Sequence, residues 1–205
     1  MRILRRASAA LAVTAVLAVP TTSAFADDGS RTVKVEGQFV PSSPFHPSKP
    51  LTYDSKTVPV GARISVVEQV GGLVGGATTS VRLQVSGLLP NHVYGAHVHS
   101  KPCGPTPDAS GPHYQNVKDP YQPSTDPAYA NPENEVWLDF KTDAQGRATA
   151  ESRHDWAFRP GEARSVIIHE HGTATKPGEA GMAGARLACL TVPFAGTTDE
   201  AGTGQ

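Results

Sequence analysis

The feature that most constrains this chain is a pair of histidines two residues apart, in the segment Gly95-Ala96-His97-Val98-His99. Successive side chains of a β-strand point to opposite faces, so His97 and His99 should share one face of a strand. Two neutral imidazoles on one rigid face form half of a metal site. The question is whether the chain supplies the other half.

The N-terminus is typical of a secretory signal peptide, which we place at residues 1–26. Three arginines precede an apolar run from Ala7 to Val19, and Ala24-Phe25-Ala26 fits a small-x-small cleavage site. We therefore expect a mature chain from Asp27 that is secreted or resides in the cell envelope. The apolar run is short for a bilayer, so we expect no membrane span in the mature chain; an uncleaved anchor is the alternative.

The charge balance argues against one class of partner. The chain has 18 Lys+Arg and 19 Asp+Glu, and removal of the three signal-peptide arginines leaves 15 basic against 19 acidic residues. A mature chain that is net acidic does not suit a general nucleic-acid binder. No interface patch is legible in the sequence, so the oligomeric state stays open.

Short β-branched runs separated by turn residues predict an all-β fold. Eight such runs indicate an antiparallel sandwich or barrel, at residues 32–40, 63–68, 79–85, 93–99, 135–142, 147–154, 164–169 and 186–194. We divide the mature chain into an N-terminal strand with a Pro/Ser-rich extension, a β-domain and a polar, disordered tail, at residues 27–60, 61–194 and 195–205.

Residues 100–134 form a long loop without periodicity, and loops of this length in a compact domain are usually functional or disordered. We favour a functional loop, because it contains Cys103 and His113. The two cysteines, Cys103 and Cys189, both lie in the exported part. An oxidising compartment makes one disulfide the expectation, with two free buried thiols as the alternative.

Four histidines are candidate metal ligands: His97, His99, His113 and His169. A cluster of imidazoles without a thiolate or paired carboxylates suits copper, and Cu(II) in particular. Zinc also accepts imidazole and is the competing metal.

The motifs around these histidines resemble the copper/zinc superoxide dismutase family. Four blocks carry the resemblance in order, between about Ser86 and Val192: Gly-Ala-His97-Val-His99, Gly-Pro-His113-Tyr, Val-Ile-Ile-His169-Glu and Gly-Ala-Arg186-Leu-Ala-Cys189. The resemblance implies an eight-stranded Greek-key barrel of the sandwich type. It also implies that the four histidines bind copper, that His113 joins copper to zinc, that Arg186 guides the anion, and that Cys103 and Cys189 form the intrasubunit disulfide.

The sequence departs from the family pattern where zinc would bind. After His113 no histidine follows until His154, which lies beyond the next strand, and the 172–185 loop looks shorter than the family's electrostatic loop. His113 with nearby Asp119 or Asp126 cannot form a four-coordinate zinc site unless two carboxylates and a water take part. We therefore expect a copper-only member without zinc, in which a carboxylate orients His113. Glu133 is the first candidate and Glu135 the second.

The resemblance implies dismutation of superoxide to oxygen and hydrogen peroxide at copper, with catalytic roles for Arg186 and for His113 as proton donor. The alternative of another class is an exported copper-binding or copper-buffering protein with the same fold and no turnover. Arg186 and the cysteine pair count against it, because storage needs no anion guide.

Overall fold

The computed structural model describes residues 30–43, 50–72 and 77–194. The expected signal peptide and the expected disordered tail lie outside the described residues. In the described part, no helix is long and apolar enough to cross a membrane.

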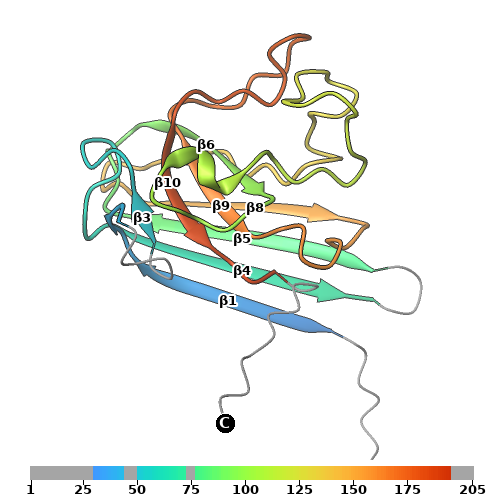
Figure 1. The fold of residues 1–205 in the computed structure, drawn as a ribbon. Helices are drawn as coiled ribbons and strands as arrows, with labels where there is room; N and C mark the ends of the chain where they lie inside the picture. The colour runs from blue at the N-terminus through green and yellow to red at the C-terminus, as the bar shows by residue number, and fades with distance from the viewer. Residues whose placement is uncertain (1–29, 44–49, 73–76, 195–205) are drawn as a thin grey trace, which may run out of the picture.

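Two sheets pack face to face as an all-β sandwich (Figure 1). The four-stranded sheet has the order β1 (Arg31–Gln38), β4 (Arg63–Gly71), β5 (Thr78–Ser86) and β8 (Ala148–His154). The six-stranded sheet has the order β2 (Val40–Pro41), β3 (Leu51–Thr52), β10 (Arg186–Thr191), β9 (Ser165–His169), β6 (Val93–His99) and β7 (Phe140–Lys141). All pairings are antiparallel except the short β2–β3 pair. The antiparallel Greek-key sandwich expected from the sequence is confirmed.

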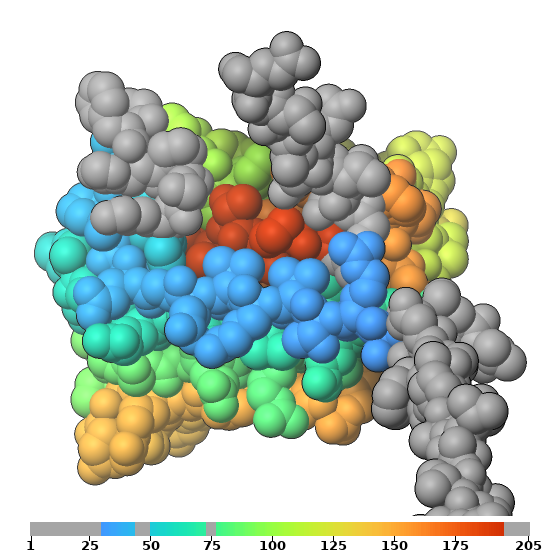
Figure 2. All heavy atoms as spheres, turned by 90° about the horizontal axis from the view of Figure 1, so that it is seen from below, coloured from blue at the N-terminus to red at the C-terminus, as the bar shows by residue number. Residues whose placement is uncertain are grey.

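The four-stranded sheet has one face in the core and one face in water. Along β4 and β5 buried and exposed positions alternate, as the period of two requires. Ile64, Val66, Leu83 and Val85 point inward and are almost completely buried. Figure 2 shows the outer face of this sheet, with β1, β4, β5 and β8 following one another from blue to orange.

The six-stranded sheet is buried on both faces at its centre. Every residue of β9 and all but the first of β6 are buried. Ala96, Val98 and Ile168 belong to the main core, whereas Ile167 packs in a second, smaller cluster with Leu51 and the two cysteines. The outer face of this sheet is therefore covered by long loops, and these loops gather on the side of the molecule away from β1 (Figure 1).

The structure corrects two details of the strand prediction. Of the predicted strand 135–142 only Phe140–Lys141 is regular. Residues 136–138 still meet β6, through Val98 N–H to Val136 O at 3.3 Å and Leu138 N–H to Ala96 O at 2.7 Å, but these bonds form no continuous ladder. The predicted Pro/Ser-rich extension contains two short strands, β2 and β3, which pair in parallel, and Val40 N–H donates to Pro50 O at 2.9 Å. The part from 27–60 that is described thus contributes β1, β2 and β3 to the two sheets.

A short 3₁₀ helix, η1 (Pro107–Ser110), lies within the 100–134 loop. Cys103 and Cys189 form the expected disulfide, which joins this loop to β10. The amide of Cys103 also donates to Thr191 Oγ1 at 3.0 Å. The start of the long loop is therefore fastened to the last strand both covalently and by a hydrogen bond.

Candidate metal centre

Strand pairing places three of the four histidines. His97 and His99 leave β6 on its outer face while Ala96 and Val98 enter the core, and both histidines are 0% exposed. His169 is the last residue of β9, where it pairs with Gly95 of β6. Gly95 is required there, because a Cβ would lie 2.5 Å from His171 O and 2.7 Å from the Ala183 side chain. The loop after β9, which includes residues 172–185 and is called the second long loop below, therefore lies against β6 directly beside the histidines.

His113 reaches the same place from the 100–134 loop, through an isolated antiparallel bridge with His99. The loop turns immediately before it at Gly111, whose φ of 70° and ψ of −166° lie in a region that only glycine adopts readily. The backbone is turned so that Gly111 O accepts a hydrogen bond from His99 Nδ1 at 2.9 Å.

The four imidazoles converge. One ligand atom from each of His97, His99, His113 and His169 lies within 4.8 Å of the others. Nε2 of His99 and Nε2 of His169 are 3.3 Å apart. The structure therefore brings together all four histidines predicted as metal ligands.

Each ring also uses its other nitrogen for a contact on the outer side of the cluster. These contacts join His97 Nε2 to Thr173 Oγ1 at 2.6 Å, His99 Nδ1 to Gly111 O at 2.9 Å, His113 Nδ1 to Glu135 Oε2 at 2.8 Å and His169 Nδ1 to Gly184 O at 3.4 Å. A carbonyl or carboxylate accepts from an N–H, so the opposite nitrogen of the ring keeps its lone pair. Such outer partners fix the tautomer and the ring orientation of metal-binding histidines.

One buried ring nitrogen indicates that the cluster fits a metal ion. His97 Nδ1 is buried and has no hydrogen-bond partner among the described residues. A buried ring nitrogen without a partner is costly in a protein that binds nothing there. A metal ion removes this cost, and four neutral nitrogens without a thiolate suit copper.

The surroundings keep three of the four rings neutral, those of His97, His99 and His169. Burial, followed by the neighbouring histidines, lowers the pKa of His97 and of His99 well below the ordinary value of 6.5. Burial, with the nearby His113, lowers the pKa of His169 to about 3. Neutral imidazole is the form that binds metal. At neutral pH, protons therefore compete little with a metal ion for these rings.

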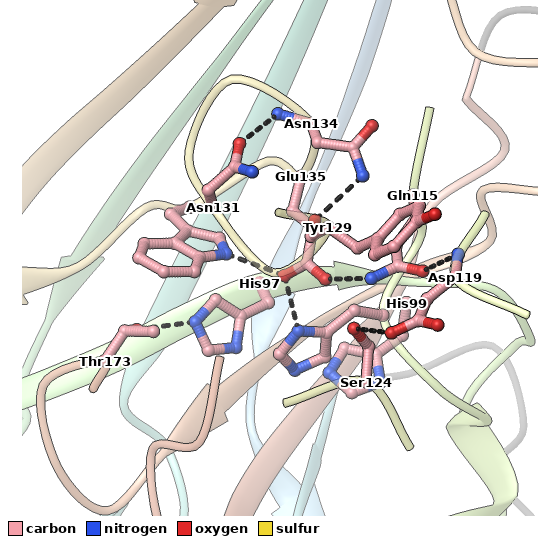
Figure 3. A network of polar contacts seen from close by, with 12 residues as sticks. His97, His99, Gln115, Asp119, Ser124, Tyr129, Asn131, Asn134, Glu135 and Thr173 are labelled. Atoms are coloured by element: carbon pink, nitrogen blue, oxygen red, sulfur yellow. Dashed lines mark hydrogen bonds and ion pairs between the residues drawn. The ribbon is translucent and has the colours of Figure 1, made fainter. Parts of the chain in front are cut away.

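The structure corrects the choice of carboxylate beside His113. Glu135, the second candidate, is buried and contacts His113; Glu133, the first candidate, is exposed, and its carbonyl accepts from Trp156 Nε1. The Glu135 carboxylate also accepts from Gln115 Nε2 at 2.8 Å and from Trp137 Nε1 at 2.7 Å (Figure 3). The chain turns immediately before residue 135, since Asn134 and Glu135 donate backbone bonds back to Asn131 O.

Arg186 lies at the mouth of the cluster. It begins β10 opposite His169, and both residues line a cavity of about 420 Å³ together with His113, Glu135 and Met182. The Arg186 Nη1 donates to Ser110 Oγ at 2.9 Å and to Pro107 O at 3.2 Å, both in η1. The disulfide that fastens this loop to β10 therefore also supports the position of the guanidinium.

Three residues in the hydrogen-bond network around the histidines were not expected from the sequence: Trp137, Asp139 and Thr173. Glu135, Trp137 and Asp139 alternate with the buried Val136, Leu138 and Phe140, so a period of two places them on the side of the histidines. This alternation is visible in the sequence, but Glu133 precedes Glu135 by two residues, so the alternation does not separate the two glutamates. Thr173 carries no comparable signal, because it lies in an irregular loop.

The fold and the site together define an all-β sandwich with a four-histidine cluster that can hold a metal ion and with an arginine beside it. Residues 65–192, more than half of the chain, match the sequence family of copper/zinc superoxide dismutase (SODC). The chain belongs to this family.

Solved structures are similar only distantly. A double mutant of a SOD-like protein from Bacillus subtilis is 18% identical, with a TM-score of 0.45 over 62% of this chain and 88% of that chain. The Cu/Zn superoxide dismutase from Brucella abortus is 20% identical, with a TM-score of 0.37 over 80% of this chain and 98% of that chain. No curated protein sequence matches the chain significantly.

The lowered histidine pKa values predict acid sensitivity of the metal-free protein. Unfolded histidines take up protons near 6.5, whereas His169 does so only near 3 in the folded state. The stability contribution is therefore complete above pH 6.5 and is lost as the pH falls from 6.5 towards 3. Between pH 7 and 5.5 we expect a loss of about 1 kcal/mol from His169, and His97 and His99 should add losses of the same sign.

Urea unfolding at the two pH values measures this loss. His169→Gln should reduce it, and His171→Gln, which changes an exposed histidine two residues away, should not. An unfolding free energy of the metal-free protein that is equal at pH 7 and 5.5 would contradict the neutral, buried cluster.

Proposed function

We propose that this protein is a copper-dependent superoxide dismutase. The observation that carries the proposal is the convergence of four ring nitrogens, each prepared as a lone-pair donor by an outer contact, beneath a cavity that Arg186 also lines. Bound copper would supply the redox chemistry, by oxidising one superoxide to oxygen and reducing a second to peroxide.

The protein supplies the binding of the anion and the handling of protons. Arg186 is about one-fifth exposed at its side chain and lines the cavity that His113 and His169 also line. A guanidinium attracts a small anion and orients it by hydrogen bonds. His113 Nε2 faces the cluster, while its Nδ1 is held by Glu135, so this ring can deliver a proton from Nε2 without losing its orientation.

The same contact supports a copper-only centre. The outer nitrogen of His113 is 2.8 Å from a Glu135 carboxylate oxygen and donates to it, so it has no lone pair for a second metal. Among the described residues, the four histidines are the one group of at least three metal-binding side chains that could share an ion. We propose that Glu135 replaces zinc as the partner that orients His113.

We further propose that the protein acts outside the cytoplasm. The signal-like N-terminal sequence and the Cys103–Cys189 disulfide both support export, because disulfides persist in oxidising compartments.

The activity itself can be tested with two neighbouring histidines. Copper-loaded protein should dismutate superoxide, and His169→Gln should lose nearly all of this activity because the copper site loses a ligand. His171→Gln should keep it, since His171 is an exposed residue outside the cluster. Pulse radiolysis measures the rate. Stoichiometric copper binding without dismutation would favour the copper-buffering alternative and would overturn the proposal.

The contribution of Arg186 is electrostatic and should depend on salt. Replacement of Arg186 by Gln should lower the dismutation rate by about tenfold at low ionic strength and flatten its decline with added salt. Arg186→Lys should retain part of the wild-type rate and part of its salt dependence. Arg63→Gln, on the opposite sheet, should change neither the rate nor the salt dependence. If the salt dependence of Arg186→Gln equals that of the wild type, Arg186 does not guide the anion.

Glu135 and Glu133 form a matched pair for the role of the carboxylate. Glu135→Gln should lower dismutation by roughly 10- to 100-fold, because an amide cannot accept from His113, Gln115 and Trp137 together. Glu133→Gln should behave like the wild type, since Glu133 is exposed. Rates measured at equal copper occupancy make the comparison, and equal rates for Glu135→Gln and the wild type would show that the carboxylate does not orient His113.

A further inference from the structure

We propose that Thr173 is a positioning residue whose hydroxyl determines which ring nitrogen of His97 faces the metal. The inference rests on the proposed copper centre, but its main test is made on the metal-free protein. Thr173 is in the loop that follows β9 and contacts the ring of His97.

Three short contacts hold Thr173 in place, two through its hydroxyl and one through its backbone amide. Thr173 Oγ1 is 2.6 Å from His97 Nε2 (Figure 3) and 2.7 Å from Asp139 Oδ1. The amide of Thr173 donates to Asp139 Oδ2 at 2.6 Å, so the carboxylate holds the residue by both its backbone and its side chain. His97 Nε2 is 3.7 Å from Asp139 Oδ1, too far for a direct hydrogen bond. The hydroxyl therefore stands between the ring and the carboxylate.

The direction of this chain of hydrogen bonds follows from the groups available. An ionised carboxylate only accepts, and Asp139 Oδ1 already accepts from the amide of Ala96 at 3.2 Å. The single hydroxyl hydrogen of Thr173 is therefore donated to Asp139. The hydroxyl oxygen must then accept from His97, which places a proton on Nε2 and leaves the lone pair on Nδ1. This is the nitrogen that is buried without a hydrogen-bond partner.

His97 differs in this respect from the other three ligands. The outer nitrogens of His99 and His169 face backbone carbonyls, which can only accept, and that of His113 faces a carboxylate. A hydroxyl can accept or donate, so Thr173 alone does not fix the tautomer of His97. The tautomer is fixed only because Asp139 determines the polarity of the hydroxyl.

A purely structural role makes a different prediction. If Thr173 only anchored its loop, its removal would lower stability without changing the proton position on His97. The proton position is thus the readout that separates the two roles.

The test is the tautomer of His97 in the metal-free protein at neutral pH, read from long-range ¹H–¹⁵N NMR spectra. The wild type and Thr173→Ser, which keeps the hydroxyl, should carry the proton on Nε2. Thr173→Val removes the acceptor and should increase the Nδ1–H form. Asp139→Asn offers an amide that can donate to the hydroxyl, and it should increase the same form. Thr149→Val, an exposed threonine on β8, is the matched control and should leave the spectrum unchanged.

Cu(II) affinity, measured by competition with a chelator, gives the second readout. Thr173→Val should weaken binding by about 10- to 100-fold, and Thr173→Ser should stay within a few-fold of the wild type. A wild-type His97 with its proton on Nδ1 would overturn the proposal even if no variant folds. Unchanged tautomer and affinity in Thr173→Val would overturn it as well. Loss of the proposed function has a separate signature, namely absent dismutation in a wild type that shows the Nε2–H form and binds copper.

Discussion

The structure depends on one constraint: four histidines converge, three of them buried and His113 partly buried, and each needs a partner for its outer nitrogen. Burial keeps three of the rings neutral, as the lowered pKa values of His97, His99 and His169 show. A neutral imidazole has one donor and one acceptor, so an acceptor on the outer side sends the lone pair inward. The partners are two backbone carbonyls, one carboxylate and one hydroxyl, and all lie in loops or irregular segments outside the regular strands.

The architecture around the centre follows from this need. The sheet supplies a rigid face, whereas the two long loops supply the acceptors and His113. These loops must approach the strands closely, which explains Gly95 beneath the second loop and Gly111 at the turn before His113. The disulfide and the contacts of Arg186 with η1 hold the first loop against β10. The cavity above His113 and His169 is bounded by the same elements that hold the ligands in place.

Much of this could be predicted from the sequence, because the ligands lie in short motifs with strand periodicity. The β-branched segments and the turns between them predicted the sandwich. The spacing of two residues between His97 and His99, together with the order of the four motif blocks, predicted the four-histidine cluster and the disulfide. The choice between Glu133 and Glu135 failed because the loop closes on Asn131 by backbone hydrogen bonds that a residue count does not reveal. Thr173 could not be found from the sequence. Its role depends on the direction of a hydrogen bond that is set by Asp139, which is far from it in the sequence.

The most direct test of the account is X-ray absorption on protein that was equilibrated with equal copper and zinc and then freed of loosely bound metal. The account predicts about one copper per chain, with four nitrogen ligands in the oxidised state, and no stoichiometric zinc. A copper site with fewer than three imidazole nitrogens would contradict the convergent cluster. A full equivalent of zinc bound beside copper would contradict the assignment of the outer nitrogen of His113 to Glu135.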